Sequence, residues 1–138
     1  MNVLIVDDQQ YVREMLSEEL ANEGYGVASV GDVESLADLL NHIQPDIVLL
    51  DLYLDGFEGW EVLRLIKRRS PKLPVLIFTA YDSFADDPRL CEADGYVVKS
   101  FSGLELLKQK IAELLEQRSI LGKMADAQVE KGIVSVGL

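Results

Sequence analysis

Short apolar runs recur along this chain, and longer stretches with apolar residues at helical spacing lie between them. Four of the runs are apolar at every position, which suits strands that are covered on both faces, as in a parallel sheet. A fifth run is weaker but also reads as a strand. The predicted strands are residues 3–6, 25–30, 47–50, 75–78 and 96–98.

The stretches between the runs predict helices. The first has apolar residues at helical spacing from Tyr11 to Leu20, and Gly24 stops it. Asp32 can cap a second helix, which Pro45 ends. Strand and helix signals therefore alternate from the start of the chain.

Three further helices complete the pattern. Asp55 and Glu58 resemble a reciprocal cap for a helix that runs to about residue 69. Asp87 can open a short helix, and Ser102 with Glu105 forms a capping box for a last helix with apolar positions up to residue 115. Alternating strands and helices predict a doubly wound α/β fold with a five-stranded parallel sheet.

The chain has 138 residues, which fits one domain. We expect that domain to span residues 1–118, because the strand and helix pattern ends there. Residues 119–138 are extra to the pattern. They are interpreted as a C-terminal tail or linker, and the alternative is a docking or dimerising segment.

Composition narrows the function. The net charge of -11 makes direct binding to nucleic acid or to an acidic membrane surface unfavourable. A single cysteine excludes an internal disulfide, which is consistent with a reducing compartment. The N-terminus does not resemble a signal peptide, and no apolar stretch is long enough to cross a bilayer. These features favour a cytoplasmic protein.

Polar residues follow four of the apolar runs directly. Asp7 and Asp8 follow the first, Asp51 the third, Thr79 the fourth and Lys99 the fifth. In open parallel sheets the ligand lies at the carboxyl ends of the strands. A strand-end aspartate is usually a helix cap and a strand-end lysine is usually solvated, so each residue alone means little. Their joint occurrence predicts a functional site.

Paired carboxylates at one strand end need a counter-ion. Magnesium accepts one or two carboxylates together with waters and phosphate oxygens. Asp8 and Asp51 are candidate direct ligands, with Asp7 acting through water. Lys99 and the Thr79 hydroxyl could each hold a phosphoryl oxygen, and an aspartate can accept a phosphoryl group covalently. The set of residues therefore favours phosphoryl transfer.

These residues and their neighbours resemble the receiver domain of two-component response regulators. The resemblance covers roughly residues 2–117, and the spacing of five separate positions makes it specific. The matching pieces are Leu4-Ile5-Val6-Asp7-Asp8, Asp51 with Gly59 downstream, Thr79-Ala80, and Gly95-Tyr96-Val97-Val98-Lys99 followed by Phe101.

The resemblance implies a role for each site residue. Asp51 is the expected phosphoacceptor, and Asp7 and Asp8 form the acidic pocket. The backbone carbonyl of Tyr53 completes the magnesium site with these three aspartates. Lys99 is the expected phosphate-sensing lysine. The protein would then be a magnesium-dependent phosphoacceptor with slow self-dephosphorylation, not a turnover enzyme.

The resemblance also implies a switch and its partners. Thr79 and Tyr96 are the expected switch pair, and the strand order is expected to be 2-1-3-4-5, as in flavodoxin-like receivers. The phosphoryl donor would be a sensor histidine kinase or a phosphotransfer protein, and the downstream partner an unknown protein. A homodimer is possible. The signal is expected to leave through the fourth helix, fifth strand and fifth helix. Because the fourth helix is short and acidic, residues 82–93 are expected to be the most mobile segment without phosphate and to become more ordered on activation or partner binding.

Three departures from the family pattern stand out. Ser100 replaces the usual proline after the lysine, which leaves the isomer of the peptide bond between Lys99 and Ser100 open. Asp55 stands where the loop usually has a proline, so it lies near the site or caps the next helix. The segment from Thr79 to Lys99 looks about two residues short, and the fourth helix should absorb the loss.

Two other functions are weighed against the phosphorylated switch. The first is a degenerate receiver that binds partners without phosphorylation, but the complete set of three aspartates argues against it. The second is a hydrolase with an aspartyl nucleophile on the first strand. Such enzymes place a second aspartate two residues later, where this chain has Gln9.

Overall fold

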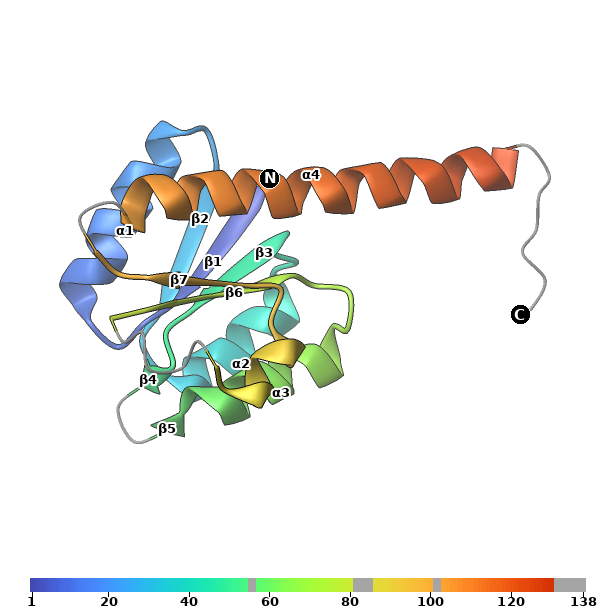
Figure 1. Ribbon diagram of the computed structural model, residues 1–138. Coiled ribbons are helices and arrows are strands. Elements are labelled where there is room, and N and C mark those ends of the chain that lie inside the picture. Colours follow the sequence, from blue (N-terminus) through green and yellow to red (C-terminus); the bar gives the residue numbers. More distant parts are fainter. Residues whose placement is uncertain (55–56, 81–85, 101–102, 131–138) are drawn as a thin grey trace.

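The computed structural model describes residues 1–54, 57–80, 86–100 and 103–130. Its centre is a five-stranded parallel sheet with the order β2-β1-β3-β6-β7 (Figure 1). The short β4 and β5 strands lie outside this sheet, so β6 and β7 are its fourth and fifth strands along the chain. The sheet therefore has the predicted order 2-1-3-4-5. The sheet strands are β1 (Asn2–Val6), β2 (Gly26–Val30), β3 (Ile47–Leu50), β6 (Val75–Thr79) and β7 (Gly95–Val98).

Helices cover both faces of the sheet. One face carries α1 (Gln10–Asn22) and α4 (Gly103–Glu130), whose buried side chains share one core layer; in Figure 1, α4 runs above the sheet and α1 stands at the left. The other face carries α2 (Val33–His42), α3 (Gly59–Arg69) and the short 3-10 helix η1 (Pro88–Glu92). The doubly wound fold is therefore confirmed.

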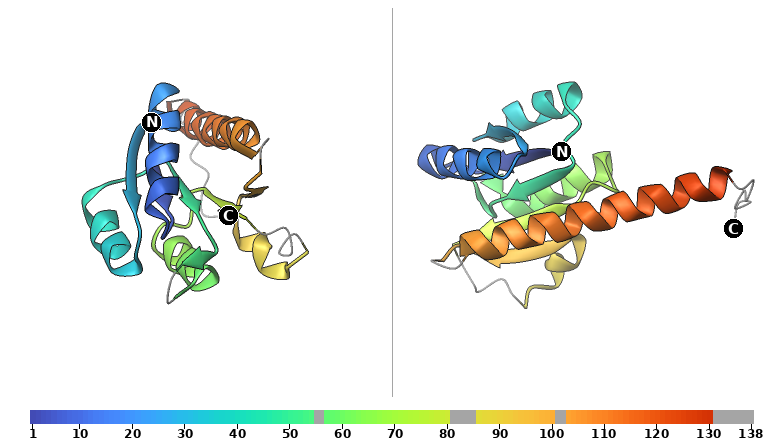
Figure 2. Two further views of the ribbon diagram at one scale, coloured as in Figure 1. Left: turned by 90° about the vertical axis from the view of Figure 1, so that its left-hand side faces the viewer. Right: turned by 90° about the horizontal axis from the view of Figure 1, so that it is seen from above.

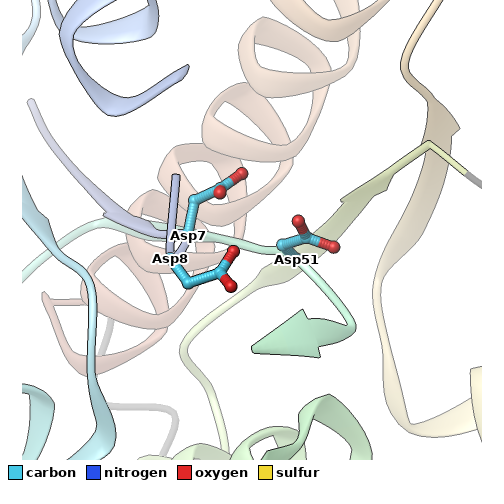
Figure 3. Close-up of side chains that lie close together, drawn as sticks. All are labelled: Asp7, Asp8 and Asp51. Carbon is cyan, nitrogen blue, oxygen red and sulfur yellow. The ribbon is translucent and has the colours of Figure 1, made fainter. Parts of the chain in front are cut away.

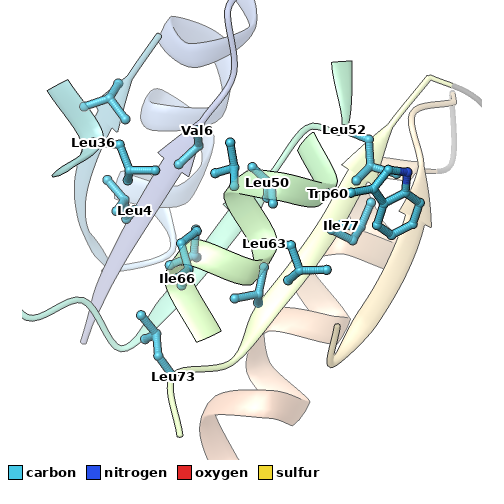
Figure 4. Close-up of a cluster of buried hydrophobic side chains, with 14 residues drawn as sticks. Leu4, Val6, Leu36, Leu50, Leu52, Trp60, Leu63, Ile66, Leu73 and Ile77 are labelled. Atoms are coloured by element: carbon cyan, nitrogen blue, oxygen red, sulfur yellow. The ribbon is translucent and has the colours of Figure 1, made fainter. Parts of the chain in front are cut away.

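Alternation along the strands divides the core into two layers. In β1, Val3 and Ile5 pack toward α1 and α4, whereas Leu4 and Val6 pack toward α2 and α3. Trp60 lies at the edge of the second layer and is only 6% exposed (Figure 4). Because both faces are covered, the strands need apolar residues at every position, which explains their sequence.

Two helix starts follow the predicted caps. The Asp32 carboxylate accepts a hydrogen bond from the Ser35 amide at the start of α2. The Asp87 carboxylate accepts one from the Arg89 amide, which opens η1. The short fourth helix is thus confirmed, and it is a 3-10 helix of five residues. Its predicted mobility stays a prediction.

The start of α3 differs from the prediction. The helix begins at Gly59, and the β4 (Tyr53–Leu54) and β5 (Phe57–Glu58) strands pair as a small antiparallel hairpin before it. The predicted start at Asp55 was therefore wrong, and Asp55 itself lies outside the described residues. The Gly59 amide donates to the Leu52 carbonyl at 2.9 Å, so backbone pairing at this point displaces the helix start.

The last helix is longer than the apolar pattern indicated. α4 has 28 residues and continues to Glu130, and its C-terminal half extends beyond the sheet (Figures 1 and 2). The role of residues 119–138 as a tail, linker or docking segment stays a prediction. No helix among the described residues has both the length and the apolar character needed to span a membrane.

Candidate functional site

Three aspartates meet at the carboxyl ends of two neighbouring strands. Val6 of β1 lies opposite Leu50 of β3, so the residues that follow these strands are placed side by side. One carboxylate oxygen each from Asp7, Asp8 and Asp51 lies within 4.8 Å of the other two (Figure 3). The structure thus brings together three of the predicted site residues.

The three carboxylates differ in environment. Asp7 and Asp51 are buried, at 2% and 7% exposure, whereas Asp8 is exposed. Asp7 Oδ1 accepts a hydrogen bond from the Gln9 amide at 2.9 Å, which fixes the side chain of Asp7. An exposed carboxylate beside two fixed, buried ones leaves the cluster accessible from one side.

Lys99 supplies the positive charge at the end of β7. Its Nζ donates to Oδ2 of Asp7 at 2.7 Å and to Oδ2 of Asp51 at 3.0 Å. Burial lowers the pKa of Lys99, but the hydrogen bond to Asp7 and the charge of Asp51 offset this, so its pKa lies above the usual value. Lys99 is therefore a fixed cation between two carboxylates.

Thr79 ends β6 and is fully buried. Its hydroxyl oxygen has no hydrogen-bond partner among the residues that the structure describes. A buried hydroxyl without a partner costs about 1–3 kcal/mol, so native structures seldom keep one. Because strand β6 lies between β3 and β7, this unsatisfied hydroxyl belongs to the same edge of the sheet as Asp51 and Lys99.

Tyr96 and Tyr53, two further residues predicted for the site, have fewer described contacts. Tyr96 lies in β7, is partly buried and packs against the core layer that contains α3. The backbone of Tyr53 belongs to β4, directly after the strand-end aspartate Asp51 and Leu52. All peptide bonds among the described residues are trans, including the one between Lys99 and Ser100.

One residue that supports the site was not predicted from the sequence. Arg13, in the first half of α1, donates from Nη1 to the backbone carbonyl of Asp7 at 2.6 Å. The bond ties the turn that carries Asp7 and Asp8 to the helix behind it. A basic residue one turn into the helix after an acidic pair is the signal that could have identified it.

The cluster suits a hard divalent cation. Oxygen ligands from two or three carboxylates match what magnesium binds, and they leave other coordination positions for water and phosphate. The single Lys99 charge faces two buried carboxylates, and Asp8 adds a third negative charge. The donor set therefore fits magnesium, and Lys99 and Thr79 end strands at the same edge of the sheet.

Comparison with known proteins agrees with this geometry. The family model of the response regulator receiver domain matches residues 3–112. Among solved structures, response regulator protein TrrA from Thermotoga maritima is 34% identical, with a TM-score of 0.76. That match covers 82% of this chain and 97% of TrrA, whose structure is a complex with Mg(2+)-BeF. A second TrrA structure contains the histidine kinase ThkA.

A longer protein matches more of the chain. NtrX from Brucella abortus is 25% identical and covers 99% of this chain with a TM-score of 0.86. This chain spans only 31% of that NtrX chain. The isolated NtrX receiver domain covers 83% of this chain, with a TM-score of 0.76. The extended end of α4 therefore has a structural counterpart in the longer NtrX chain.

Proposed function

Since the chain belongs to the response regulator receiver domain family, we propose that it is a signalling switch that accepts a phosphoryl group on Asp51. The main support is the position of Asp51 between the Asp7 and Asp8 carboxylates and the Lys99 ammonium group. Asp51 therefore lies beside two candidate metal ligands, Asp7 and Asp8, and beside the Lys99 ammonium group. Asp7 also contacts Lys99, at 2.7 Å, but its other carboxylate oxygen accepts a hydrogen bond from the Gln9 amide.

Asp7, Asp8 and Asp51 would hold a magnesium ion, with the backbone carbonyl of Tyr53 as a further ligand. Bound magnesium would neutralise the charge on the transferring phosphoryl group and bring the donor close to Asp51. TrrA, the 34% identical relative, was crystallised with Mg(2+)-BeF, which supports the assignment. Arg13 would keep the Asp7 turn in place through its carbonyl bond.

The donor would be a histidine kinase or a phosphotransfer protein that carries a phosphohistidine. In the transfer, the P–N bond of the phosphohistidine breaks while a P–O bond forms to a carboxylate oxygen of Asp51. The histidine nitrogen keeps the electron pair and takes up a proton. TrrA forms a complex with the histidine kinase ThkA, which supports this class of partner.

The phosphoryl group would give Thr79 the partner that its buried hydroxyl lacks. Lys99 would donate to another phosphoryl oxygen and release its bond to Asp7 or Asp51. Movement of Thr79 toward the phosphate would let Tyr96 turn inward, and the surface near β7 would change. These contacts exist only in the phosphorylated state, so they can shift the equilibrium between two conformations.

Intact mass spectrometry tests the proposal. The protein is incubated with acetyl phosphate or a phosphorylated histidine kinase, with and without magnesium. We expect a mass gain of one phosphoryl group that requires magnesium, that Asp51→Asn abolishes, and that Asp32→Asn, a helix-cap control, preserves. Phosphorylation of the Asp51→Asn protein would show that the acceptor is wrong. No mass gain in the wild type would support a degenerate receiver instead.

A further inference from the structure

The basic residues of this acidic chain are unevenly placed. The segment 62–81 contains no acidic residue, while all 24 acidic residues lie elsewhere. Charge of one sign concentrated on one part of a surface attracts partners of the opposite sign. The segment holds five of the chain's 13 basic residues, namely Arg64, Lys67, Arg68, Arg69 and Lys72.

Most of these basic side chains form no ion pair with a described residue. Lys67 pairs with Asp94 at 2.6 Å, but the other four are exposed and form no ion pair with a described residue. Three of the five lie in the last turn of α3, where the helix dipole favours positive charge. That explanation does not cover Arg64 and Lys72, which lie outside that turn.

Lys72 stands at the rim of a groove of about 610 Å³ between α4 and the loop after α3. Arg118 from α4 supplies a second cation on its lining, although its Nη1 already donates to the Asp46 carbonyl at 2.6 Å. Asp94, which pairs with Lys67, also lines the groove, and the apolar lining includes Leu114 and Leu121. Leu121 is 67% exposed, so its apolar side chain is open to a partner. A second hollow of about 500 Å³ adjoins the same loop and shares Lys72 and Arg118.

Gly122 lies in the wall of this groove, inside α4. Glycine disfavours the helical conformation relative to alanine, so packing usually explains a glycine inside a helix. Here a Cβ atom would have no other atom within 4 Å. The fold itself therefore does not require glycine at this position. Its absent side chain leaves room for another backbone to approach the helix closely.

The groove lies away from the Asp51 site. Pro74 and Asp94, which line it, directly precede β6 and β7, whereas the aspartate cluster follows the carboxyl ends of the strands. Its α4 wall, from Leu114 to Gly122, also lies beyond residue 112, where the match to the family model ends. One wall of the groove therefore lies outside the part of the chain that matches the family, and the other wall, with Lys72 and Pro74, lies inside it.

We propose that this α3–α4 groove binds a short segment of a partner protein that carries both acidic and apolar side chains. Carboxylates of the segment would pair with Lys72 and Arg118, and its apolar side chains would cover Leu114 and Leu121. A short segment fits within the groove, whose charged lining consists of Lys67, Lys72 and Arg118 together with Asp94, the partner of Lys67. A nucleic acid would extend past it and meet the acidic remainder of the chain, which repels phosphates.

Titration with defined probes tests the groove by ¹⁵N-resolved NMR on the full chain. The probes are a short Glu-Leu alternating peptide, a peptide with the same residues at helical spacing, their Lys-Leu counterparts and a single-stranded oligonucleotide. We expect at least one acidic peptide to shift the amide signals of 71–74 and 114–122. Raising the salt from about 0.1 to about 1 M should weaken binding strongly, because it shortens the Debye length from about 10 to about 3 Å.

Three variants separate the proposed contacts. Lys72→Glu should weaken peptide binding roughly tenfold, and Leu121→Ser should weaken it at unchanged charge. The matched control is Lys123→Glu, an exposed α4 residue that lines a different hollow, beside Met1 and Tyr25. Gly122→Leu should raise the melting temperature yet reduce binding, a combination that a purely structural glycine would not give.

Several results would overturn the proposal. They are the absence of groove shifts with both acidic peptides, equal binding by Lys72→Glu and Lys123→Glu, and tighter binding of the oligonucleotide than of either peptide. Self-association of the chain through the groove, seen by sedimentation and lost in Lys72→Glu, would assign the surface to a second copy instead. None of these outcomes depends on phosphorylation of Asp51, so failure here leaves the proposed function untouched.

Discussion

Lys99 Nζ lies 3.0 Å from Oδ2 of Asp51, although 48 residues separate them in the sequence. The pair joins the ends of β7 and β3, two strands with β6 between them. Lys99 also reaches Asp7 on the far side of Asp51, at 2.7 Å. In the described state, Lys99 is thus the counter-ion for a carboxylate cluster that would otherwise carry only negative charge.

This relationship predicts that bound magnesium and the Lys99 ammonium group can replace each other in stabilising the folded protein. Lys99→Met should lower the free energy of unfolding by about 2 kcal/mol without magnesium, because two buried carboxylates lose a charged hydrogen-bond donor. Saturating magnesium should restore much of the loss, since a ligand at about 100 times its Kd stabilises by about 2.7 kcal/mol. Denaturant titrations with magnesium or with a chelator measure both quantities.

Lys110→Met is the control, because the Lys110 side chain is 44% exposed and its Glu113 partner lies on the same helix. That variant should change stability little, and magnesium should affect it as it affects the wild type. An equal magnesium effect on Lys99→Met and on the wild type would mean that the cation does not replace the lysine.

The same ion pairs predict a dependence on alkaline pH. The pKa of Lys99 is raised above 10.5 in the folded protein, so the pairs stabilise the fold below the unfolded pKa of Lys99. Their contribution should be lost as the pH rises through the folded pKa. The stability difference between wild type and Lys99→Met should therefore stay constant from pH 7 to about 10 and shrink above that. A difference that grows at high pH would contradict the assignment.

Thr79→Val should stabilise the unphosphorylated protein. The hydroxyl of Thr79 is buried and has no partner among the described residues, so valine removes an unsatisfied polar group and keeps the shape. We expect a gain of about 1 kcal/mol in the free energy of unfolding. Phosphorylation of Asp51 should remain possible, but the change in solvent exposure of Tyr96 on phosphorylation should disappear.

Thr79→Ser provides the comparison, because it keeps the hydroxyl and loses only the methyl group. It should retain the response of Tyr96 and lose stability. If Thr79→Val proves less stable than the wild type, the hydroxyl must already be satisfied in the resting protein.

Gly59→Ala should be destabilising because it disturbs the loop after Asp51. An added Cβ would lie 2.5 Å from the Leu52 carbonyl oxygen and 2.7 Å from its carbon, so rigid backbone would have to move. We expect a loss of about 1–3 kcal/mol in the free energy of unfolding, as for other overpacked sites, with slower phosphorylation. Gly122→Ala should instead gain about 1 kcal/mol, because its Cβ meets open space in a helix.

The contact between Arg89 and Trp60 predicts that this pair of side chains holds η1 against α3. The Arg89 guanidinium carbon lies 4.4 Å from the centre of the Trp60 ring, and η1 contributes no buried residue of its own. Because Trp60 is the single tryptophan, its fluorescence reports this contact. Arg89→Gln should shift the emission and speed amide exchange at 88–92, whereas Lys123→Gln, an exposed change on α4, should do neither. Strong, unchanged protection of η1 in Arg89→Gln would show that other contacts hold it.

The sequence alone determined the sheet and the chemistry of its edge. Runs of apolar residues specify strands covered on both faces, and residues that follow such strands must meet at one edge. The positions of Asp7, Asp8, Asp51, Thr79 and Lys99 followed from that rule. The helix caps at Asp32 and Asp87 were also predictable from the sequence, since each cap joins residues two or three positions apart.

Only the tertiary structure decided the features that depend on distant partners. The start of α3 moved to Gly59 because its backbone pairs with Leu52, and apolar periodicity carries no signal for such a bond. That the Thr79 hydroxyl has no hydrogen-bond partner among the described residues is a property of the packed interior, which the threonine and its neighbours in sequence do not reveal. The groove beside Lys72 exists because α4 continues past the sheet and faces a loop some 45 residues earlier in the chain. Local periodicity selects elements, whereas contacts between remote residues form only when the whole core packs.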